Sequence, residues 1–274
     1  MKGISSAFDV FIREPDDIRT AALRMREISE ELGPFLILAC DDISSPAPMC
    51  DAEGNILAVE VFRWVEKSNW YQNKALALGD PISVACRHES ETFCFSGGRF
   101  ISNQPSGLLN SDDLCNIGKL GFNPTSGIIV PIHMSMGTIG AVGWYNFDED
   151  FDVVPVYRRH GDDLLVMASR FINGYRKVTR PNDQLKVNDP HLTKREVLCL
   201  KWAAFGKTDE EIALIIGRST STIRFHLNNA AMKLNTSNRP QTVVKASQLG
   251  FIGQYHMAAS PSVAGCAKQQ SKKV

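Results

Sequence analysis

Apolar residues near the beginning of the chain recur with the period of an α-helix. The stripe they form between positions 14 and 33 consists of Ile18, Ala22, Met25 and Ile28. Spacings of three and four residues place such a stripe on one buried face. Pro15 suits the first turn of this helix and Gly33 suits its end. The pattern therefore predicts an amphipathic helix at 14–33.

Shorter apolar runs predict strands. Two candidates are FLILAC at 35–40 and NILAVEVFRW at 55–64. Further along, TSGIIVPIH at 125–133 and TIGAVGWYNF at 138–147 flank the short turn MSMG. Two such runs around a turn that contains glycine predict an antiparallel hairpin.

Helical patterns separate and follow these strands. Residues 65–88 favour helix, and residues 154–178 predict a long helix. The apolar face of that long helix is expected to consist of Leu164, Leu165, Ala168 and Phe171. An order of helix, strands, helices, strand, hairpin and helix is typical of the α+β class. We therefore expect residues 1–178 to form an α/β/α sandwich around a mainly antiparallel sheet.

The patterning changes after this first domain. Residues 179–190 lack periodicity and are rich in Pro, Asn and Asp, which predicts a linker. Residues 191–256 are patterned only as helices, which predicts an all-α domain of four helices. The tail at 257–274 is composed of small and polar residues, which is typical of disorder.

Capping residues define the helices of the second domain. Two capping boxes, Thr193 with Glu196 and Thr208 with Glu211, each predict a helix start. The helices that follow should end at glycines, and the next should start at a serine; these residues are Gly206, Gly217 and Ser219. The residues expected to face inward from the short second helix are Ile212, Ile215 and Ile216. Two helices joined by a tight turn, the second of the pair longer, are typical of a helix-turn-helix.

The last helix of this motif has two contrasting faces. Its buried stripe is expected to consist of Ile223, Leu227, Ala230 and Leu234. The opposite face carries Ser221, Arg224, Phe225, Asn228 and Met232, and no acidic residue occurs from Ser219 to Asn238. Arg can pair with guanine, Asn with adenine, and an apolar group with the thymine methyl. This composition favours a surface that reads DNA.

Other residues of the domain suit contacts with phosphates, which set the position of a protein on the duplex. The full set of candidate DNA-binding residues is Lys207, Thr208, Ser221, Thr222, Arg224, Phe225, Asn228, Lys233 and Arg239. A small helical domain that binds another protein is the alternative reading of the same pattern. His226 lies at the edge of the buried stripe and is interpreted as a packed structural residue.

Charge separates the two domains. The chain as a whole is neutral. Residues 1–187 hold 18 Lys and Arg against 25 Asp and Glu, a balance of −7, and residues 188–274 hold 12 against 5, a balance of +7. A basic module beside an acidic one indicates that the basic module binds a polyanion.

Several classes of protein are not indicated. The seven cysteines are scattered, and no C-x-x-C pair suggests a zinc site or a disulfide framework. No apolar run is long enough to span a bilayer and the N-terminus does not resemble a signal peptide. No nucleophile–base pair, metal cluster or phosphate loop points to an enzyme. We therefore expect a cytoplasmic protein with neither catalytic residues nor a metal or resident cofactor.

The helical domain resembles the DNA-binding domain of LuxR-type regulators. The similar run, about 191–252, includes LTKRE, GKT, EIA, STI, KLN and SNR at matching positions. The resemblance implies four helices, a last helix at about 239–249 that supports a dimer, and base-facing residues at Arg224, Phe225 and Asn228. The expected partners are double-stranded DNA and a second copy of the chain, with RNA polymerase as a further candidate.

The first domain is compared with two input domains that accompany this helix-turn-helix. FLILACDD is superficially similar to the start of a phosphorylated receiver, but the alternation of parallel strands and helices and the later Lys-Pro step are absent. Residues 10–175 instead resemble the acyl-homoserine-lactone-binding domain of quorum-sensing regulators. The matching positions are Tyr71, Asp80, Pro81, Phe95 and the run GIIVPI from Gly127.

That resemblance implies an apolar pocket in which one carboxylate accepts the amide N–H of the ligand. The candidate ligand-binding residues are Trp64, Trp70, Tyr71, Asp80, Phe95 and Gly143. Asp80 followed by Pro81 also reads as a helix N-cap, which is compatible with a place in a pocket.

The chain departs from the family at three pocket positions. Lys67 stands where the family has a Trp, Arg63 where it has a Tyr, and Gly143 where it has a polar residue. Trp64 or Trp70 could replace the missing indole. The sequence thus predicts a LuxR-type transcriptional regulator that senses an acyl-homoserine lactone or a related small apolar signal. The alternative is an orphan regulator whose first domain serves only dimerisation or partner binding.

Overall fold

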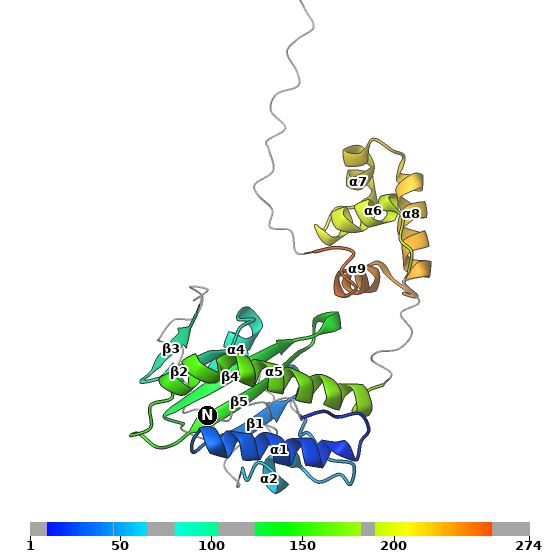
Figure 1. Ribbon diagram of the computed structural model, residues 1–274. Coiled ribbons are helices and arrows are strands. Elements are labelled where there is room, and N and C mark those ends of the chain that lie inside the picture. Colours follow the sequence, from blue (N-terminus) through cyan, green and yellow to red (C-terminus); the bar gives the residue numbers. More distant parts are fainter. Residues whose placement is uncertain (1–9, 46, 65–79, 104–123, 182–189, 254–274) are drawn as a thin grey trace, which may run out of the picture. The chain divides into compact units, whose positions relative to one another are not determined.

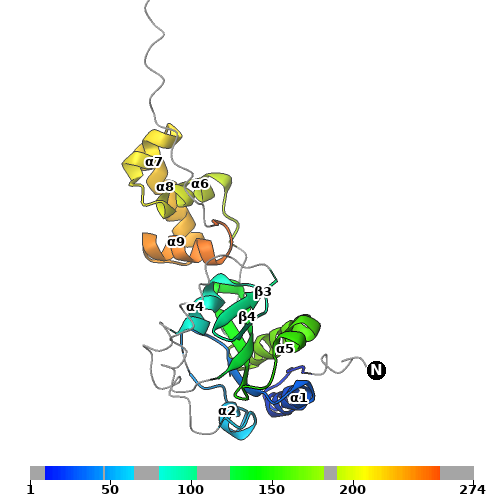
Figure 2. The ribbon, with the colours of Figure 1, turned by 90° about the vertical axis from the view of Figure 1, so that its left-hand side faces the viewer.

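The computed structural model describes residues 10–45, 47–64, 80–103, 124–181 and 190–253. The chain divides into two compact units, Met1–Val187 and Asn188–Val274. The division lies within the stretch 179–190. Figures 1 and 2 show an α+β first unit and an all-helical second unit. The fold class expected from the sequence is therefore confirmed.

A five-stranded sheet forms the centre of the first unit. Its strands are β1 (Leu36–Cys40), β2 (Phe93–Ser96), β3 (Arg99–Ser102), β4 (Ser126–His133) and β5 (Ile139–Asn146). They lie in the order β1-β5-β4-β2-β3, and every neighbouring pair is antiparallel. The hairpin predicted at 125–147 is β4 and β5, which pair from Ser126 with Asn146 to His133 with Ile139.

Helices cover both faces of this sheet. The long helix α5 (Val154–Thr179) packs on β4, β2 and β5 and is accompanied by α1 (Asp17–Leu32). The short helix α4 (Pro81–His88) packs on β4 and β5 from the other side. Figure 2 shows α1 and α5 on one side of the strands and α4 on the other. This is the expected α/β/α sandwich.

Successive side chains of each strand point to opposite faces of the sheet, and they therefore form two separate hydrophobic cores. Ile128, Val130 and Trp144 belong to the core beneath α1 and α5. Their neighbours Ile129 and Tyr145 point the other way, toward α4. The predicted stripes of α1 and α5 lie in the first core, with Ile18, Ala22, Met25, Ile28, Leu164, Ala168 and Phe171 buried and Leu165 partly so.

The strand predicted at 55–64 is wrong. Residues 57–60 form the short helix α2 (Leu57–Glu60) instead. Leu57, Ala58, Val61 and Phe62 are buried there, whereas Val59 is exposed. Buried positions spaced by one and four residues have the helical period, and a short apolar run alone does not separate helix from strand.

A buried hydrogen bond joins α1 to the sheet. The Trp144 Nε1–H donates to Ser29 Oγ at 2.7 Å, and the Ser29 hydroxyl donates to the Met25 carbonyl at 2.7 Å. Both side chains are buried. Ser29 lies on the apolar face of α1 because it completes this link, and an apolar residue there would leave a buried indole N–H without an acceptor.

Ser29→Ala is therefore expected to lower the free energy of unfolding of the first unit by about 1–3 kcal/mol, the cost of an unsatisfied buried donor. Urea unfolding followed by tryptophan fluorescence measures the change. Ser45→Ala, at an exposed position, is the control and should stay within roughly 0.5 kcal/mol of wild type. An equal effect of the two substitutions would contradict a role for the buried bond.

Residues 190–253, the described part of the second unit, form four helices. They are α6 (Lys194–Ala204), α7 (Asp209–Ile216), α8 (Thr220–Lys233) and α9 (Arg239–Gln248). Both capping boxes are present, and Gly217 caps α7 in the left-handed conformation that glycine adopts without strain. The stripe Ile223, Leu227, Ala230 and Leu234 packs inward as expected.

One of the residues predicted to face inward from α7 does not do so. Ile215 is 46% exposed, and Ala213 is buried in its place beside Ile212. The covered positions of α7 are Ile212, Ala213 and, in part, Ile216, a spacing of one and four residues that leaves Ile215 at the edge of the buried face. In the residues that the structure describes, no helix is both long and apolar enough to cross a bilayer.

Candidate functional site

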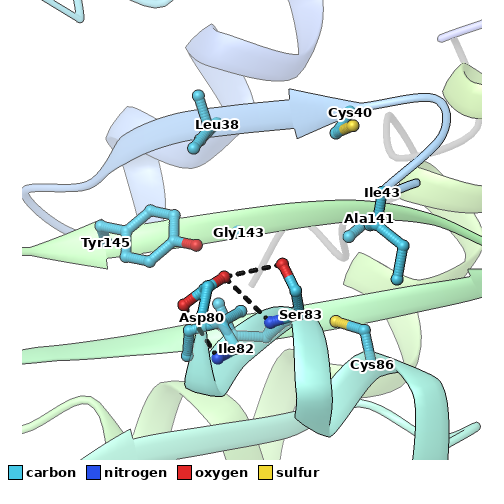
Figure 3. Close-up of a pocket in the computed structure, with 11 residues that line it drawn as sticks. Leu38, Cys40, Ile43, Asp80, Ile82, Ser83, Cys86, Ala141, Gly143 and Tyr145 are labelled. Carbon is cyan, nitrogen blue, oxygen red and sulfur yellow. Dashed lines mark hydrogen bonds between the residues drawn. The ribbon is translucent and has the colours of Figure 1, made fainter. Parts of the chain in front are cut away.

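A small cavity opens on the face of the sheet covered by α4. Its walls come from β1, β4, β5, α4 and the turn after β1, and its lining residues are Leu38, Cys40, Ile43, Asp80, Ile82, Ser83, Cys86, Ile129, Ala141, Gly143 and Tyr145. Figure 3 shows Asp80 and Ser83 at the start of α4, facing the strand that carries Gly143 and Tyr145. The site is apolar with a few grouped polar atoms, as ligand pockets usually are.

Asp80 is the acidic residue among the described residues that line this cavity. It caps α4, since its carboxylate accepts the backbone N–H groups of Ile82 and Ser83 at 3.1 and 2.9 Å and the Ser83 hydroxyl at 2.7 Å. Pro81 follows at the first helical position. Burial raises the pKa of Asp80, and the hydrogen bonds from Ser83 and Ile82 oppose that rise. The cap reading is confirmed, and the same carboxylate lines the cavity.

The other ligand-binding candidates are placed around this carboxylate. Phe95 and Trp64 are buried in the same core, with ring centroids 6.2 and 5.6 Å from that of Tyr145. Gly143 lines the cavity itself. Trp70 and Tyr71 lie outside the described residues. The structure therefore brings four of the six candidates to one face of the sheet.

Tyr145 was missed by sequence reasoning. A Cβ atom built on Gly143 would lie 2.4–2.8 Å from the Tyr145 ring and hydroxyl, so the phenol occupies the space that a side chain at 143 would need. Figure 3 shows the hydroxyl directed along β5 toward Gly143. Strand alternation was the available signal, because residues 143 and 145 share a face.

The cavity is small. Its volume is about 30 Å³, which is similar to the share of liquid volume of a single water molecule, roughly 30 Å³. The lining thiols of Cys40 and Cys86 remain neutral because burial raises the pKa of each, that of Cys40 to about 12. Among the described residues, no group of three His, Cys, Asp or Glu side chains could hold a metal ion.

The exposed face of α8 is the second candidate site. Phe225 and Met232 are 61% and 71% exposed, although both are large and apolar. Arg224 and Asn228 are exposed on the same face. At the start of α8, the Ser219 hydroxyl caps the helix and lies 2.9 and 2.8 Å from the hydroxyls of Ser221 and Thr222. His226 is half-buried.

Every candidate phosphate-binding cation has an acidic neighbour. Lys207 Nζ lies 3.7 Å from Glu211. Arg239 pairs with Asp209 and also donates to the Lys207 carbonyl. Thr208 is exposed and caps α7, and its hydroxyl oxygen accepts the backbone N–H of Glu211 at 3.2 Å. The Arg239–Asp209 pair joins two helices and could not be read from the sequence of either, whereas Lys207 and Glu211 are four residues apart at the start of α7.

Lys233 has a structural role that sequence reasoning missed. Its ammonium donates to both carboxylate oxygens of Glu196, at 2.9 and 3.0 Å, and to the His191 carbonyl at 3.1 Å. Glu196 is buried and also accepts the backbone N–H of Thr193 at 2.8 Å. Burial pushes the pKa of Glu196 upward, but the bonds from Lys233 and Thr193 outweigh it and hold that pKa below 4.5.

The second unit matches a family model described as bacterial regulatory proteins of the luxR family, over residues 190–246. Residues 190–246 are therefore similar to the luxR family of bacterial regulatory proteins. The match spans α6, α7 and α8 and nearly all of α9, and it confirms the resemblance drawn from the sequence.

Curated relatives extend the likeness beyond the LuxR-type domain. The transcriptional activator LuxR of Aliivibrio fischeri is 35% identical over 127 residues, 46% of this chain and 50% of LuxR. The transcriptional activator EchR of Dickeya chrysanthemi is 26% identical over 198 residues, 69% of this chain and 75% of EchR. Both alignments are longer than the second unit and so include part of the first. The chain spans about half the length of the LuxR relatives that it matches.

A solved structure of SdiA in complex with octanoyl-rac-glycerol is also similar. It covers 87% of this chain and 91% of its own, with 20% identity and a TM-score of 0.38. So low a score supports no inference about what this chain binds.

Proposed function

We propose that this chain is a DNA-binding transcriptional regulator. The observation that carries the proposal is the surface of α8, where Arg224, Phe225 and Asn228 are exposed together. No acidic residue occurs from Ser219 to Asn238 to repel phosphates. An exposed helix of this composition, preceded by a short helix and a tight turn, suits the major groove.

A dimer would place two such helices on two half-sites of a pseudo-palindrome. Val244 of α9 is 55% exposed, which supports a contact between copies through that helix. RNA polymerase is a further candidate partner for a regulator bound at a promoter.

The experiment that tests this function is selection of duplexes from a randomised library by the purified full chain. We expect a pseudo-palindromic consensus whose half-site centres are separated by about one helical turn, 10–10.5 base pairs, or a multiple of it. Recovery of random sequences would overturn the proposal. A consensus without two-fold symmetry would support sequence-specific DNA binding but contradict binding as a symmetric dimer.

We propose that the first unit senses a small apolar molecule with an N–H group, of the acyl-homoserine lactone class. The buried Asp80 carboxylate within an apolar lining supports this assignment, because a buried amide N–H needs an acceptor. The small volume of the cavity supports a second candidate, an orphan regulator that acts without ligand because its own side chains fill the pocket.

Mass spectrometry of what the full chain carries separates the two candidates. The protein is purified from cells grown with and without long-chain acyl lactones and then extracted. Recovery of a lactone in stoichiometric amount would support the sensor, whereas an empty extract from both cultures would support the orphan regulator.

Asp80→Asn tests the ligand anchor. Asparagine is as good an N-cap as aspartate, so folding should persist, while the loss of a charge-assisted bond should weaken ligand binding by about 1.5–3 kcal/mol. Lactone-dependent thermal stabilisation of the chain measures the change. Ser83→Ala, which keeps the carboxylate, is the matched control. If the stabilisation survives Asp80→Asn unchanged, Asp80 serves only as a cap.

A further inference from the structure

The carboxylate of Asp209 connects three helices of the LuxR-type domain. Asp209 is the first residue of α7, and its side chain is 19% exposed. Oδ1 accepts a hydrogen bond from Arg239 of α9, and Oδ2 accepts the Nε–H of Arg224 of α8 at 3.3 Å. Arg239 also donates to the Lys207 carbonyl, just before α7. Asp209 is therefore itself held in place by α9.

The contacts of Arg224 occupy one edge of its guanidinium group. Nε donates to Asp209, and Nη2 donates to Glu210 Oε1 at 3.4 Å. Arginine has five N–H donors in a planar fork. One on Nε and one on Nη2 are engaged by the acidic residues, so three N–H donors stay available at the end formed by Nη1 and Nη2. A bidentate contact with guanine O6 and N7 needs two parallel donors, and this end can supply them while the acidic contacts persist.

We propose that Asp209 is a positioning residue that holds the side edge of Arg224 and directs its outer edge at a guanine. This inference rests on the proposed DNA-binding function and adds a residue that does not itself touch DNA. Glu210 is the weaker of the two acidic contacts, since its side chain is 64% exposed whereas that of Asp209 is 19% exposed. Asp209, anchored by Arg239, sets the orientation.

Both acids also lie close to the surface that would approach phosphates. They should therefore weaken binding to every duplex by repulsion, whatever its sequence. Ordering a long side chain in advance favours only the specific complex. The repulsion acts on specific and non-specific complexes alike and leaves the ratio of their affinities nearly unchanged. Asp209 thus raises this ratio by ordering Arg224, whereas Glu210, whose contact with Arg224 is weaker, changes it little.

The test compares Asp209→Asn with Glu210→Gln, which removes the same charge one residue further along. Affinities of the full chain are measured for the selected duplex and for a random-sequence duplex at several salt concentrations. We expect both variants to bind the random duplex more tightly. Only Asp209→Asn should lose affinity for the selected duplex, by roughly 2- to 10-fold, the effect of leaving one long side chain unordered.

A second measurement needs no DNA. The Nε–H signal of Arg224, assigned by its absence in Arg224→Lys, should exchange slowly with solvent in wild type and faster in Asp209→Asn. Asp209→Glu should restore part of both effects. Equal specificity ratios for the asparagine and glutamine variants, or unchanged exchange at Arg224, would overturn the positioning role. Failure of the wild type to prefer any sequence would instead overturn the proposed function, and the exchange measurement would still decide the role of Asp209.

Discussion

Lys233→Met is expected to lower the stability of the second unit by about 3 kcal/mol. Removing one partner of a buried ion pair typically costs 3–5 kcal/mol because the other charge is left uncompensated. Glu196, whose side chain is only 3% exposed, would keep the Thr193 N–H as a partner but lose its cation. The lower end of the range applies because the Lys233 side chain is 37% exposed.

Hydrogen exchange of α6 and α8 peptides in the full chain measures this loss separately from the first unit. The matched control is Glu196→Gln combined with Lys233→Met. It removes both charges and should recover much of the stability, since a neutral pair leaves no buried charge. A double variant as unstable as Lys233→Met alone would contradict the ion-pair account. Unchanged stability with weaker DNA binding would make Lys233 a phosphate contact, as the sequence suggested.

The same pair predicts a dependence on pH. The pKa of Glu196 is lowered on folding, so its contribution to stability is complete above its unfolded value of about 4.5 and is lost as pH falls through the folded value. Acid should therefore destabilise α6 and α8 in wild type, whereas Lys233→Met should show a smaller loss over the same range.

Arg224→Ala is expected to cost about 1–3 kcal/mol in affinity for the selected duplex and to relax base preference at one position. The reason is that a bidentate Arg–guanine contact favours the correct base over a wrong one by about 1–3 kcal/mol. Affinities for the selected duplex and for its single-base variants at each position measure both effects. Arg224→Lys should lose the preference as well, because a single ammonium cannot form the fork.

Lys194→Ala is the control for charge alone, since Lys194 is an exposed cation on another helix. It should weaken all duplexes slightly and leave base preference intact. If Arg224→Ala behaves in the same way, with an equal loss on every sequence, then Arg224 contacts phosphate and reads no base.

Local signals predicted the second unit well. Thr193, Thr208 and Ser219 each cap the helix that follows, as the sequence indicated. Such caps depend on residues three positions apart, which the sequence displays directly. Ile215 was misplaced because a helix of barely two turns fits more than one buried face, and packing covers the face that carries Ile212, Ala213 and Ile216.

The first unit was predicted less completely. The stripe of α1 and the β4–β5 hairpin were found, because long amphipathic helices and paired runs around a turn have clear periods. The pattern at 55–64 predicts a strand where the fold has the helix α2, since a short apolar run fits either period. Tyr145 was overlooked because its importance comes from the glycine two positions earlier, over which its ring lies.

The sequence by itself determined the helix-turn-helix, the sandwich and the carboxylate cap at Asp80, because periodicity and capping act within a few residues. Only the tertiary structure decided which charged side chains form ion pairs with other helices. Arg224 meets Asp209 across 15 positions, and Lys233 meets Glu196 across 37. Ion pairs between helices depend on how the helices pack, and packing is set by all the apolar contacts of the unit together. A cation that reads as a DNA contact in the sequence can therefore be a structural residue in the fold.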